Sequence, residues 1–251
     1  MKVVVIGGTG LIGSKVVQRL TAAGHDAVAA SPASGVDTMT GDGLEQALTG
    51  ADVVVDVSNS PSFEDAAVLD FFTTAGRNVA AAEKATGVRH HVAVSIVGAD
   101  RLPDSGYLRA KVAQEAVIEG SGVQWTILRS TQFFEFAGGI AQGGTDGDVV
   151  RLPDAELQPV AADDVADAVA ALAMGEPAQG RVELGGPEAL PFAEFVRRYL
   201  ANRGDEREVV ADPHARYFGT ELSDGELVAG QGAHRGKVTL AEWLQTPAAH
   251  R

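Results

Sequence analysis

The segment IGGTGLIG, at positions 6–13, constrains the fold of this chain more than any other feature. It follows the apolar run Val3–Ile6 and precedes a helical pattern over Leu11–Ala23, which ends before Gly24. Glycines with this spacing allow a sharp turn of the backbone and a close contact between the start of a helix and a strand. The segment therefore predicts a strand, a glycine loop and a helix that open a parallel βαβ unit.

The same alternation continues through the first half of the chain. Short apolar runs, typical of strands buried on both faces, are separated by helical patterns that end at glycines. The predicted strands are Val3–Ile6, Ala27–Ala30, Val53–Val57, Val92–Ser95 and Trp125–Leu128, and the predicted helices are Leu11–Ala23, Asp65–Thr86 and Tyr107–Glu119. This rhythm indicates the α/β class, with a doubly wound parallel sheet of the Rossmann type.

The pattern loosens after about residue 135. The glycine-rich segment Gly138–Gly147 has no apolar period, and we expect it to leave the sheet. Two more helices are predicted at Asp163–Ala173 and Phe192–Arg203, with a short strand at Val182–Leu184 between them. We therefore expect a nucleotide-binding core over residues 1–135 and a small C-terminal substrate lobe over 136–251, from which about 158–185 returns to the core.

The glycine loop also predicts a ligand, although a tight turn without a ligand is the alternative. Unpaired N–H groups at the start of a helix favour phosphate, so we expect the loop to hold the pyrophosphate of a dinucleotide. The residues expected to contact it are Gly7, Thr9, Gly10, Leu11, Ile12 and Gly13. An acid after the second strand would select NAD, but Ser31 lies there, so we expect Ser31 to face a 2′-phosphate and NADP (NADPH) to be favoured over NAD. No Lys or Arg lies between Asp26 and Gly50 to neutralise that phosphate.

Composition narrows the class of partner. The 251 residues include 20 basic and 34 acidic side chains, which give a net charge of −14, and no run of Lys or Arg. Binders of nucleic acid or membrane surfaces normally present a basic patch, so we expect a small-molecule substrate and neither of those partners. The absence of cysteine excludes disulfides and thiolate chemistry and fits a cytoplasmic protein. The sequence leaves open whether the protein is a monomer or a homodimer.

An ordered series of segments covers nearly the whole chain. They are GGTGLIG, GVDTMTGDGLEQALTGADVVV, NVAAAEKATGVRHHVAVS, SGYLRAK, GVQWTILRSTQFFE, PVAADDVADAVAAL and GRVELGGPEAL. Together they resemble the NmrA-like, atypical branch of the short-chain dehydrogenase/reductase superfamily. That branch includes quinone and ether reductases, and also regulators that bind the dinucleotide without turning it over.

The resemblance implies further cofactor contacts. In such proteins a residue at the position of Asp37 approaches the adenine, and the loop that contains Ser58 and Asn59 runs along the cofactor. Ser130 and Thr131 are expected to flank the nicotinamide. Members of the family commonly have a proline at the position of Ser130.

The segment SGYLRAK contains the strongest candidates for catalysis. Tyr107 and Lys111 are four positions apart, so a helix places both side chains on one face, and Ser95 lies twelve positions before Tyr107. A nearby ammonium lowers the pKa of a phenol, which can donate a proton to a carbonyl oxygen as hydride arrives, while a serine hydroxyl holds that oxygen. We expect Ser95, Tyr107 and Lys111 to be catalytic, with Lys111 also bound to the nicotinamide ribose. A structural helix start is the alternative.

The aromatic residues have two interpretations. Phe133 and Phe134 form either a core cluster or a hydrophobic wall of the substrate site. Tyr217, in the C-terminal lobe, is expected to close over the substrate.

Three polar residues invite a functional role. Asn78 either orients a water behind the lysine or lies on a helix surface. His90 and His91 are adjacent on a strand and therefore point to opposite faces, so we expect no metal site.

These features together predict an NAD(P)H-dependent reductase. It would transfer hydride to a small carbonyl or quinone-type substrate, with Tyr107 as the proton donor. The alternative is a non-catalytic NAD(P)-binding redox sensor that acts through a protein partner. A third possibility is an epimerase or dehydratase that uses the cofactor transiently.

Overall fold

The computed structural model describes residues 1–250, which form two compact units. The first unit consists of Met1–Ser95, Gly106–Arg129 and Val165–Val182. The second consists of Ile96–Ser105, Ser130–Asp164 and Glu183–Arg251. The chain therefore leaves the first unit and returns to it twice. No helix within residues 1–250 is long and apolar enough to cross a membrane.

A parallel sheet is the centre of the first unit. Its strands are β1 (Lys2–Ile6), β2 (Asp26–Ala30), β3 (Val53–Asp56), β4 (His90–Ile96) and β5 (Gln124–Ser130). With β9 (Gly180–Gly185) and β12 (His234–Arg235) the sheet has seven strands in the order β12-β9-β5-β4-β3-β1-β2. Val4 and Val5 of β1 are fully buried because both faces of the sheet are covered. The predicted doubly wound α/β fold is confirmed.

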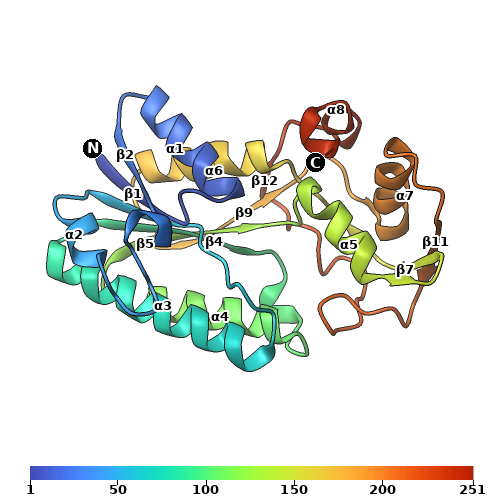
Figure 1. The fold of residues 1–251 in the computed structure, drawn as a ribbon, viewed down its shortest axis with the longest axis horizontal. Helices are drawn as coiled ribbons and strands as arrows, with labels where there is room; N and C mark the ends of the chain where they lie inside the picture. Colours follow the sequence, from blue (N-terminus) through green and yellow to red (C-terminus); the bar gives the residue numbers. More distant parts are fainter. Residues whose placement is uncertain (251) are drawn as a thin grey trace. The chain divides into compact units, whose positions relative to one another are not determined.

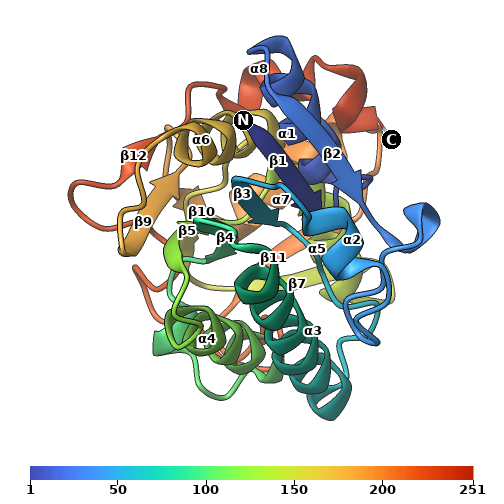
Figure 2. The same cartoon turned by 90° about the vertical axis from the view of Figure 1, so that its left-hand side faces the viewer.

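Helices lie on both faces of this sheet. α1 (Leu11–Ala22) and α6 (Ala162–Met174) are on one face, where Arg19 of α1 pairs with Asp167 of α6. α3 (Asp65–Thr86) and α4 (Gly106–Glu119) lie side by side on the other face (Figure 1). Figure 2 shows the same layers from the side, with the sheet between the two helix pairs. The sequence predicted these four helices to within one residue at most ends.

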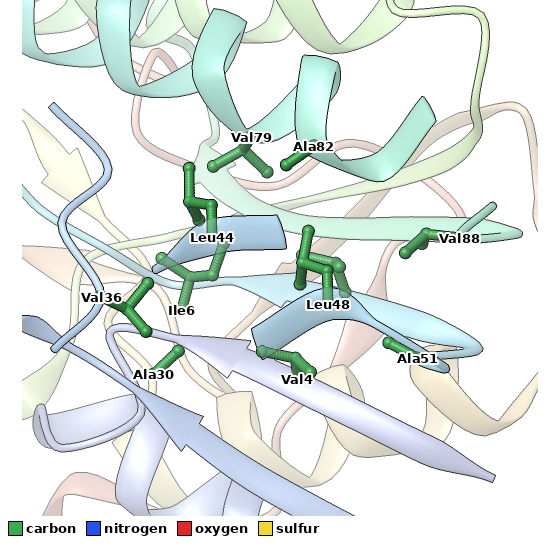
Figure 3. Close-up of a cluster of buried hydrophobic side chains, with 11 residues drawn as sticks. Val4, Ile6, Ala30, Val36, Leu44, Leu48, Ala51, Val79, Ala82 and Val88 are labelled. Atoms are coloured by element: carbon green, nitrogen blue, oxygen red, sulfur yellow. The ribbon is translucent and has the colours of Figure 1, made fainter. Parts of the chain in front are cut away.

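A buried apolar cluster holds the short helix α2 (Leu44–Leu48), which the sequence did not predict, between the sheet and α3. Figure 3 shows Leu44 and Leu48 pointing into this cluster. The other members include Val4, Ile6, Ala30, Val36, Ala51, Val79, Ala82 and Val88. Ile6 and Ala30 are the last residues of β1 and β2, so the cluster fixes the strand ends from which the candidate site is built.

The second unit contains two small sheets and three helices. One sheet joins β6 (Thr145–Asp146), β7 (Val149–Pro153) and β11 (Glu208–Asp212), and the other joins β8 (Glu156–Leu157) and β10 (Leu190–Pro191). The helices are α5 (Ala137–Gly143), α7 (Phe192–Asn202) and α8 (Leu240–Leu244). Rings of Phe134, Phe195 and Trp243 form part of the core of this unit.

The segment Gly138–Gly147 lies outside the seven-stranded sheet, and α5, which the sequence did not predict, occupies its first half. This helix buries Ala137, Ile140 and Ala141, whose spacing of three and four residues places them on one face. The face is short and lies among glycines, which weaken a helical pattern in the sequence.

Candidate functional site

The glycine loop between β1 and α1 lies at the carboxyl end of the parallel sheet. β1 is bonded to β2 on one side and to β3 on the other, so the order of connection reverses beside it. Ligands of open parallel sheets bind at the carboxyl ends of the strands, at such a reversal. The loop after β3 is immediately adjacent, because a Cβ atom on Gly7 would lie 2.9 Å from Ser58 N.

Packing requires most of the loop glycines. A Cβ on Gly8 would lie 2.7 Å from Ala29 Cα, and a Cβ on Gly13 would lie 2.1 Å from Gly7 O. Gly10 is different, because it is exposed and its Cβ would meet only Gly7 O, at 3.2 Å, among the described residues. The backbone is therefore open to solvent at Gly10, where the sequence predicts a pyrophosphate.

The N-terminus of α1 is available to an anion. The N–H of Ser14 donates to Gly10 O at 3.0 Å, and for the preceding residues Leu11–Gly13 the helix provides no such acceptor. Within the part of the chain that the structure describes, α1 has no side-chain cap and no acidic residue in its first turn. These properties fit the phosphates of a dinucleotide.

The end of β2 carries the residue that the sequence assigns to a 2′-phosphate. Ser31 is 7% exposed, and its Oγ is one of the buried polar atoms without a hydrogen-bond partner among residues 1–250. The neighbouring Ser34 Oγ accepts from Ser31 N at 2.9 Å.

Asp37 lies in a tight turn. Its Oδ1 accepts from the N–H groups of Met39, at 2.7 Å, and Thr40, at 3.3 Å. Asn78 of α3 holds the same turn, because its Nδ2 donates to Thr38 O at 2.8 Å and to Met39 O at 2.9 Å. The amide of Asn78 is half-buried on α3 and anchors the Asp37 turn, a role that the sequence did not predict.

Tyr107 is the second residue of α4 and is half-buried. Its ring packs against Phe63 and Phe72, with centroids 5.3 Å and 6.2 Å away, and its hydroxyl donates to Asn59 Oδ1 at 3.1 Å. Burial raises the pKa of Tyr107 to about 12, and the hydrogen bond with Asn59 offsets only part of this effect.

Lys111, one turn later on α4, is 4% exposed. Its Nζ donates to Val94 O at 2.9 Å and to Gln114 Oε1, and it lies 4.4 Å from the centre of the Phe72 ring. Burial lowers the pKa of Lys111 to about 8, against the opposing effect of nearby carboxylates, of which Asp56 has the larger influence.

Lys111 is not among the groups that shift the pKa of Tyr107, so its predicted effect on the phenol stays a prediction. An ammonium close to the hydroxyl would lower the pKa of Tyr107, but that pKa is raised. The physical reason is that Lys111 directs its charge to Gln114, whose Nε2 donates to Asp56 Oδ2 at 3.0 Å. Sequence reasoning missed both partners, although Gln114 is three residues from Lys111 and Asp56 is the polar end of an apolar strand.

Ser95 is buried on the face of the sheet that α4 covers. Glu115 of α4 forms two hydrogen bonds with the guanidinium of Arg129, at 2.9 Å and 2.7 Å. Burial would raise the pKa of Glu115, but the hydrogen bonds with Arg129 lower it, and Ser95 Oγ has no hydrogen-bond partner among residues 1–250. The structure therefore places Ser95 beside a buried ion pair that the sequence did not suggest.

In the second unit, the two residues expected near the nicotinamide are buried. Ser130 Oγ donates to Thr131 O at 3.0 Å, and Thr131 Oγ1 donates to Gln158 O at 2.5 Å. Each hydroxyl has a single proton, which is already donated within the unit, so toward a ligand these groups can act as acceptors.

The aromatic residues of the second unit differ in exposure. Phe134 is 1% exposed and belongs to the core, whereas Phe133 is half-buried and stacks on the exposed ring of Phe136 at 5.1 Å. Tyr217 packs edge-on against Phe192 at 5.2 Å and Phe218 at 4.7 Å. Phe134 therefore belongs to the core, and a place in a hydrophobic wall of the substrate site stays a prediction for Phe133.

The two histidines have separate partners. His90 Nε2 is 2.9 Å from Thr126 Oγ1 on β5, and His91 Nδ1 is 2.6 Å from Glu83 Oε1 on α3. Burial lowers the pKa of His90 to about 4, whereas the Glu83 carboxylate overcomes burial and raises the pKa of His91. Residues 1–250 contain no group of three or more side chains that could hold a metal ion.

Comparison with known proteins agrees with this geometry. Residues 7–175 match a family model described as NAD(P)H-binding. The chain belongs to this NAD(P)H-binding family. The family model agrees with the resemblance inferred from the sequence, in that both describe proteins that bind NAD(P)H.

Three known proteins are similar to this chain. Divinyl chlorophyllide a 8-vinyl-reductase of Cucumis sativus, a chloroplastic protein, is 29% identical over 223 residues, which cover 74% of this chain. The match spans about half, 52%, of that protein. UDP-glucose 4-epimerase of Thermus thermophilus, solved with NAD, has a TM-score of 0.75 at 21% identity and covers 100% of this chain and 98% of its own. A short-chain dehydrogenase/reductase superfamily protein of Agrobacterium tumefaciens with bound NAD has a TM-score of 0.73 at 18% identity, with coverage of 100% and 96%.

A side chain at Gly10 is predicted to block the dinucleotide without disrupting the fold. Gly10→Val should weaken NADPH binding by roughly 100-fold or more, because the side chain would occupy the open space in front of the loop. Isothermal titration calorimetry and urea unfolding test this, with Gly139→Ala, whose Cβ would meet nothing within 4 Å, as the control. Unchanged affinity in a folded Gly10→Val protein would contradict the assignment.

Burial of Lys111 predicts a gain in stability at high pH. The folded-state pKa of about 8 lies below the ordinary value of 10.5, so the unfolded state binds more protons between these values and the free energy of unfolding rises with pH there. From pH 7.5 to pH 10 the gain should be roughly 2 kcal/mol in the wild type and absent in Lys111→Met. Urea unfolding of both proteins at the two pH values measures it, and parallel pH dependences would show that Lys111 is not the group responsible.

Proposed function

We propose that this protein is an NAD(P)H-dependent reductase that transfers hydride to a small carbonyl or quinone-type substrate, with Tyr107 as the proton donor. The observation that carries the proposal is the phenol of Tyr107, held by Asn59 in the loop that follows β3. That loop adjoins the glycine loop, where we expect the pyrophosphate of the dinucleotide. Hydride donor and proton donor would then meet at one end of the sheet.

Different residues would bind the cofactor and donate the proton. The backbone of Gly7–Gly13 would hold the pyrophosphate, and Asp37 and the Ser58–Asn59 segment would lie along the rest of the cofactor. When bound, the reduced nicotinamide supplies the hydride. Tyr107 then donates its proton to the substrate oxygen, on which negative charge develops.

At neutral pH Tyr107 is protonated, which is the form that reduction requires. Its pKa of about 12 makes it a weaker acid than a free phenol, so the proton would move to the substrate oxygen only as negative charge develops there. Oxidation or epimerisation of an alcohol would begin with removal of a proton and would need the phenolate.

The similarity to a vinyl-reductase also supports reductase activity.

The second candidate, a non-catalytic sensor that binds NAD(P) and contacts a protein partner, is favoured by one observation. Lys111 donates to Gln114 and Val94 O, and it does not lower the pKa of Tyr107. The acidic net charge and the absence of cysteine support a small-molecule substrate and a cytoplasmic location as part of the main proposal.

We also propose that NADPH is preferred over NADH. Support comes from Ser31, which stands at the end of β2 in place of an acid and has a buried hydroxyl without a partner among the described residues. An acid there would accept the ribose hydroxyls of NAD and repel a 2′-phosphate.

Replacement of the Tyr107 hydroxyl tests the proton donor. Tyr107→Phe should reduce kcat and kcat/KM together by roughly 10²–10⁴, because the proton is needed in the transition state, and should leave NADPH affinity unchanged. Steady-state NADPH oxidation with one accepted carbonyl substrate measures this, with Tyr199→Phe in the second unit as the matched control. A sensor would show no turnover in the wild type, and equal rates for wild type and Tyr107→Phe would refute the role of the phenol.

A charge at position 31 tests the cofactor preference. Ser31→Asp should shift the ratio of the NADPH and NADH dissociation constants toward NADH by roughly tenfold or more, because the carboxylate repels the 2′-phosphate. Ser34→Asp, three residues away, is the matched control. A wild-type protein that already binds NADH more tightly would show that the NADPH preference is wrong.

A further inference from the structure

Tyr107 and Lys111 are linked by an indirect route through the loop after β3. The route begins at the Tyr107 hydroxyl, which donates to Asn59 Oδ1 at 3.1 Å. It ends at Lys111 Nζ, which donates to Gln114 Oε1. Every residue on it belongs to the first unit.

The orientation of the Asn59 amide is determined by the backbone. Asn59 Oδ1 also accepts from the N–H of Ser60 at 2.9 Å, which identifies the atom that faces the phenol as the oxygen. An amide oxygen can only accept a hydrogen bond, so it directs the O–H of Tyr107 toward itself. Asn59 therefore selects one orientation of a hydroxyl that could otherwise rotate.

The segment that carries Asn59 is attached to α4. Asp56 Oδ1 accepts from Ser58 N at 3.0 Å and from Ser58 Oγ at 2.6 Å, and Asp56 Oδ2 accepts from Gln114 Nε2 at 3.0 Å. Asp56 and Gln114 are 4% and 3% exposed. These buried bonds fix the loop to the helix that carries the phenol, and Lys111 occupies the other end of the Gln114 amide.

We propose that Asn59 is a positioning residue, which holds the phenol of Tyr107 in place and gives up the phenolic proton when a substrate oxygen accepts it instead, and that Asp56 and Gln114 hold Asn59 in place against α4. This rests on the proposed role of Tyr107 as the proton donor. Lys111 then acts on the phenol through the geometry of the loop and not through its charge. If the loop had only a structural role, substitution of Asn59 would change stability or cofactor affinity equally with and without the Tyr107 hydroxyl.

A double-mutant cycle tests this dependence. Asn59→Ala should lower kcat by roughly tenfold, with the KM of the carbonyl substrate and the NADPH dissociation constant each changed less than about twofold. In a Tyr107→Phe background the same substitution should leave kcat unchanged, because the hydroxyl that Asn59 orients is absent. Asn202→Ala, which removes an exposed amide of the second unit, is the control. An equal loss of kcat in both backgrounds, or a loss confined to NADPH affinity, would overturn the proposal.

Urea unfolding of the same four proteins provides a readout that does not need turnover. The shift of the midpoint caused by Asn59→Ala should be smaller when Tyr107 is Phe, because the bond between the two side chains is already missing. Additive shifts would overturn the proposal. A wild type that oxidises no NADPH with any carbonyl or quinone would instead refute the proposed function, and the unfolding cycle would still decide whether Asn59 holds the hydroxyl.

Discussion

The buried ammonium of Lys111 is the constraint on which the arrangement of the candidate site depends. A cation in the interior loses the hydration it has in water and must be compensated by polar partners. Compensation comes from the Gln114 amide, which is bonded to Asp56, from a backbone carbonyl of β4 and from the face of Phe72. These contacts join α4 to α3 and to two central strands. They also explain why the charge is not available to lower the pKa of Tyr107.

In the proposed function, the tasks of a reductase are divided among segments far apart in the sequence. The glycine loop offers backbone N–H groups, and the loop after β3 adjoins it and holds the phenol of Tyr107 through Asn59. Because the phenol remains protonated at neutral pH, the site is prepared to give a proton rather than to take one. Hydride transfer to a carbonyl needs a proton in this direction. In the proposed arrangement Lys111 helps to fix the position of the Tyr107 phenol through the loop after β3. The superfamily resemblance had implied that the charge of Lys111 would lower the pKa of this phenol.

Much of the fold was predictable because its signals are local. α3 has its predicted bounds because Gly87, with φ of +76°, ends it in a conformation that favours glycine. The glycine loop was recognisable for the same reason. The link from Asp56 to Gln114 was not, since the two residues are 58 positions apart and no sequence period connects them. Nor does the spacing of Tyr107 and Lys111 on a helix predict which group the ammonium of Lys111 contacts. That group is the amide of Gln114, which is itself bonded to the buried carboxylate of Asp56.

The protonation state of Tyr107 is the most direct test of this account. NMR of protein labelled with ¹³C at the ring carbon that bears the hydroxyl, with Tyr107→Phe to assign the resonance, reports ionisation of the phenol as a function of pH. The account predicts no titration of Tyr107 below about pH 11, in keeping with its raised pKa. A midpoint near pH 7 or 8 would mean that Lys111 does stabilise a phenolate, and it would contradict the claim that its charge is directed to Gln114 and Asp56.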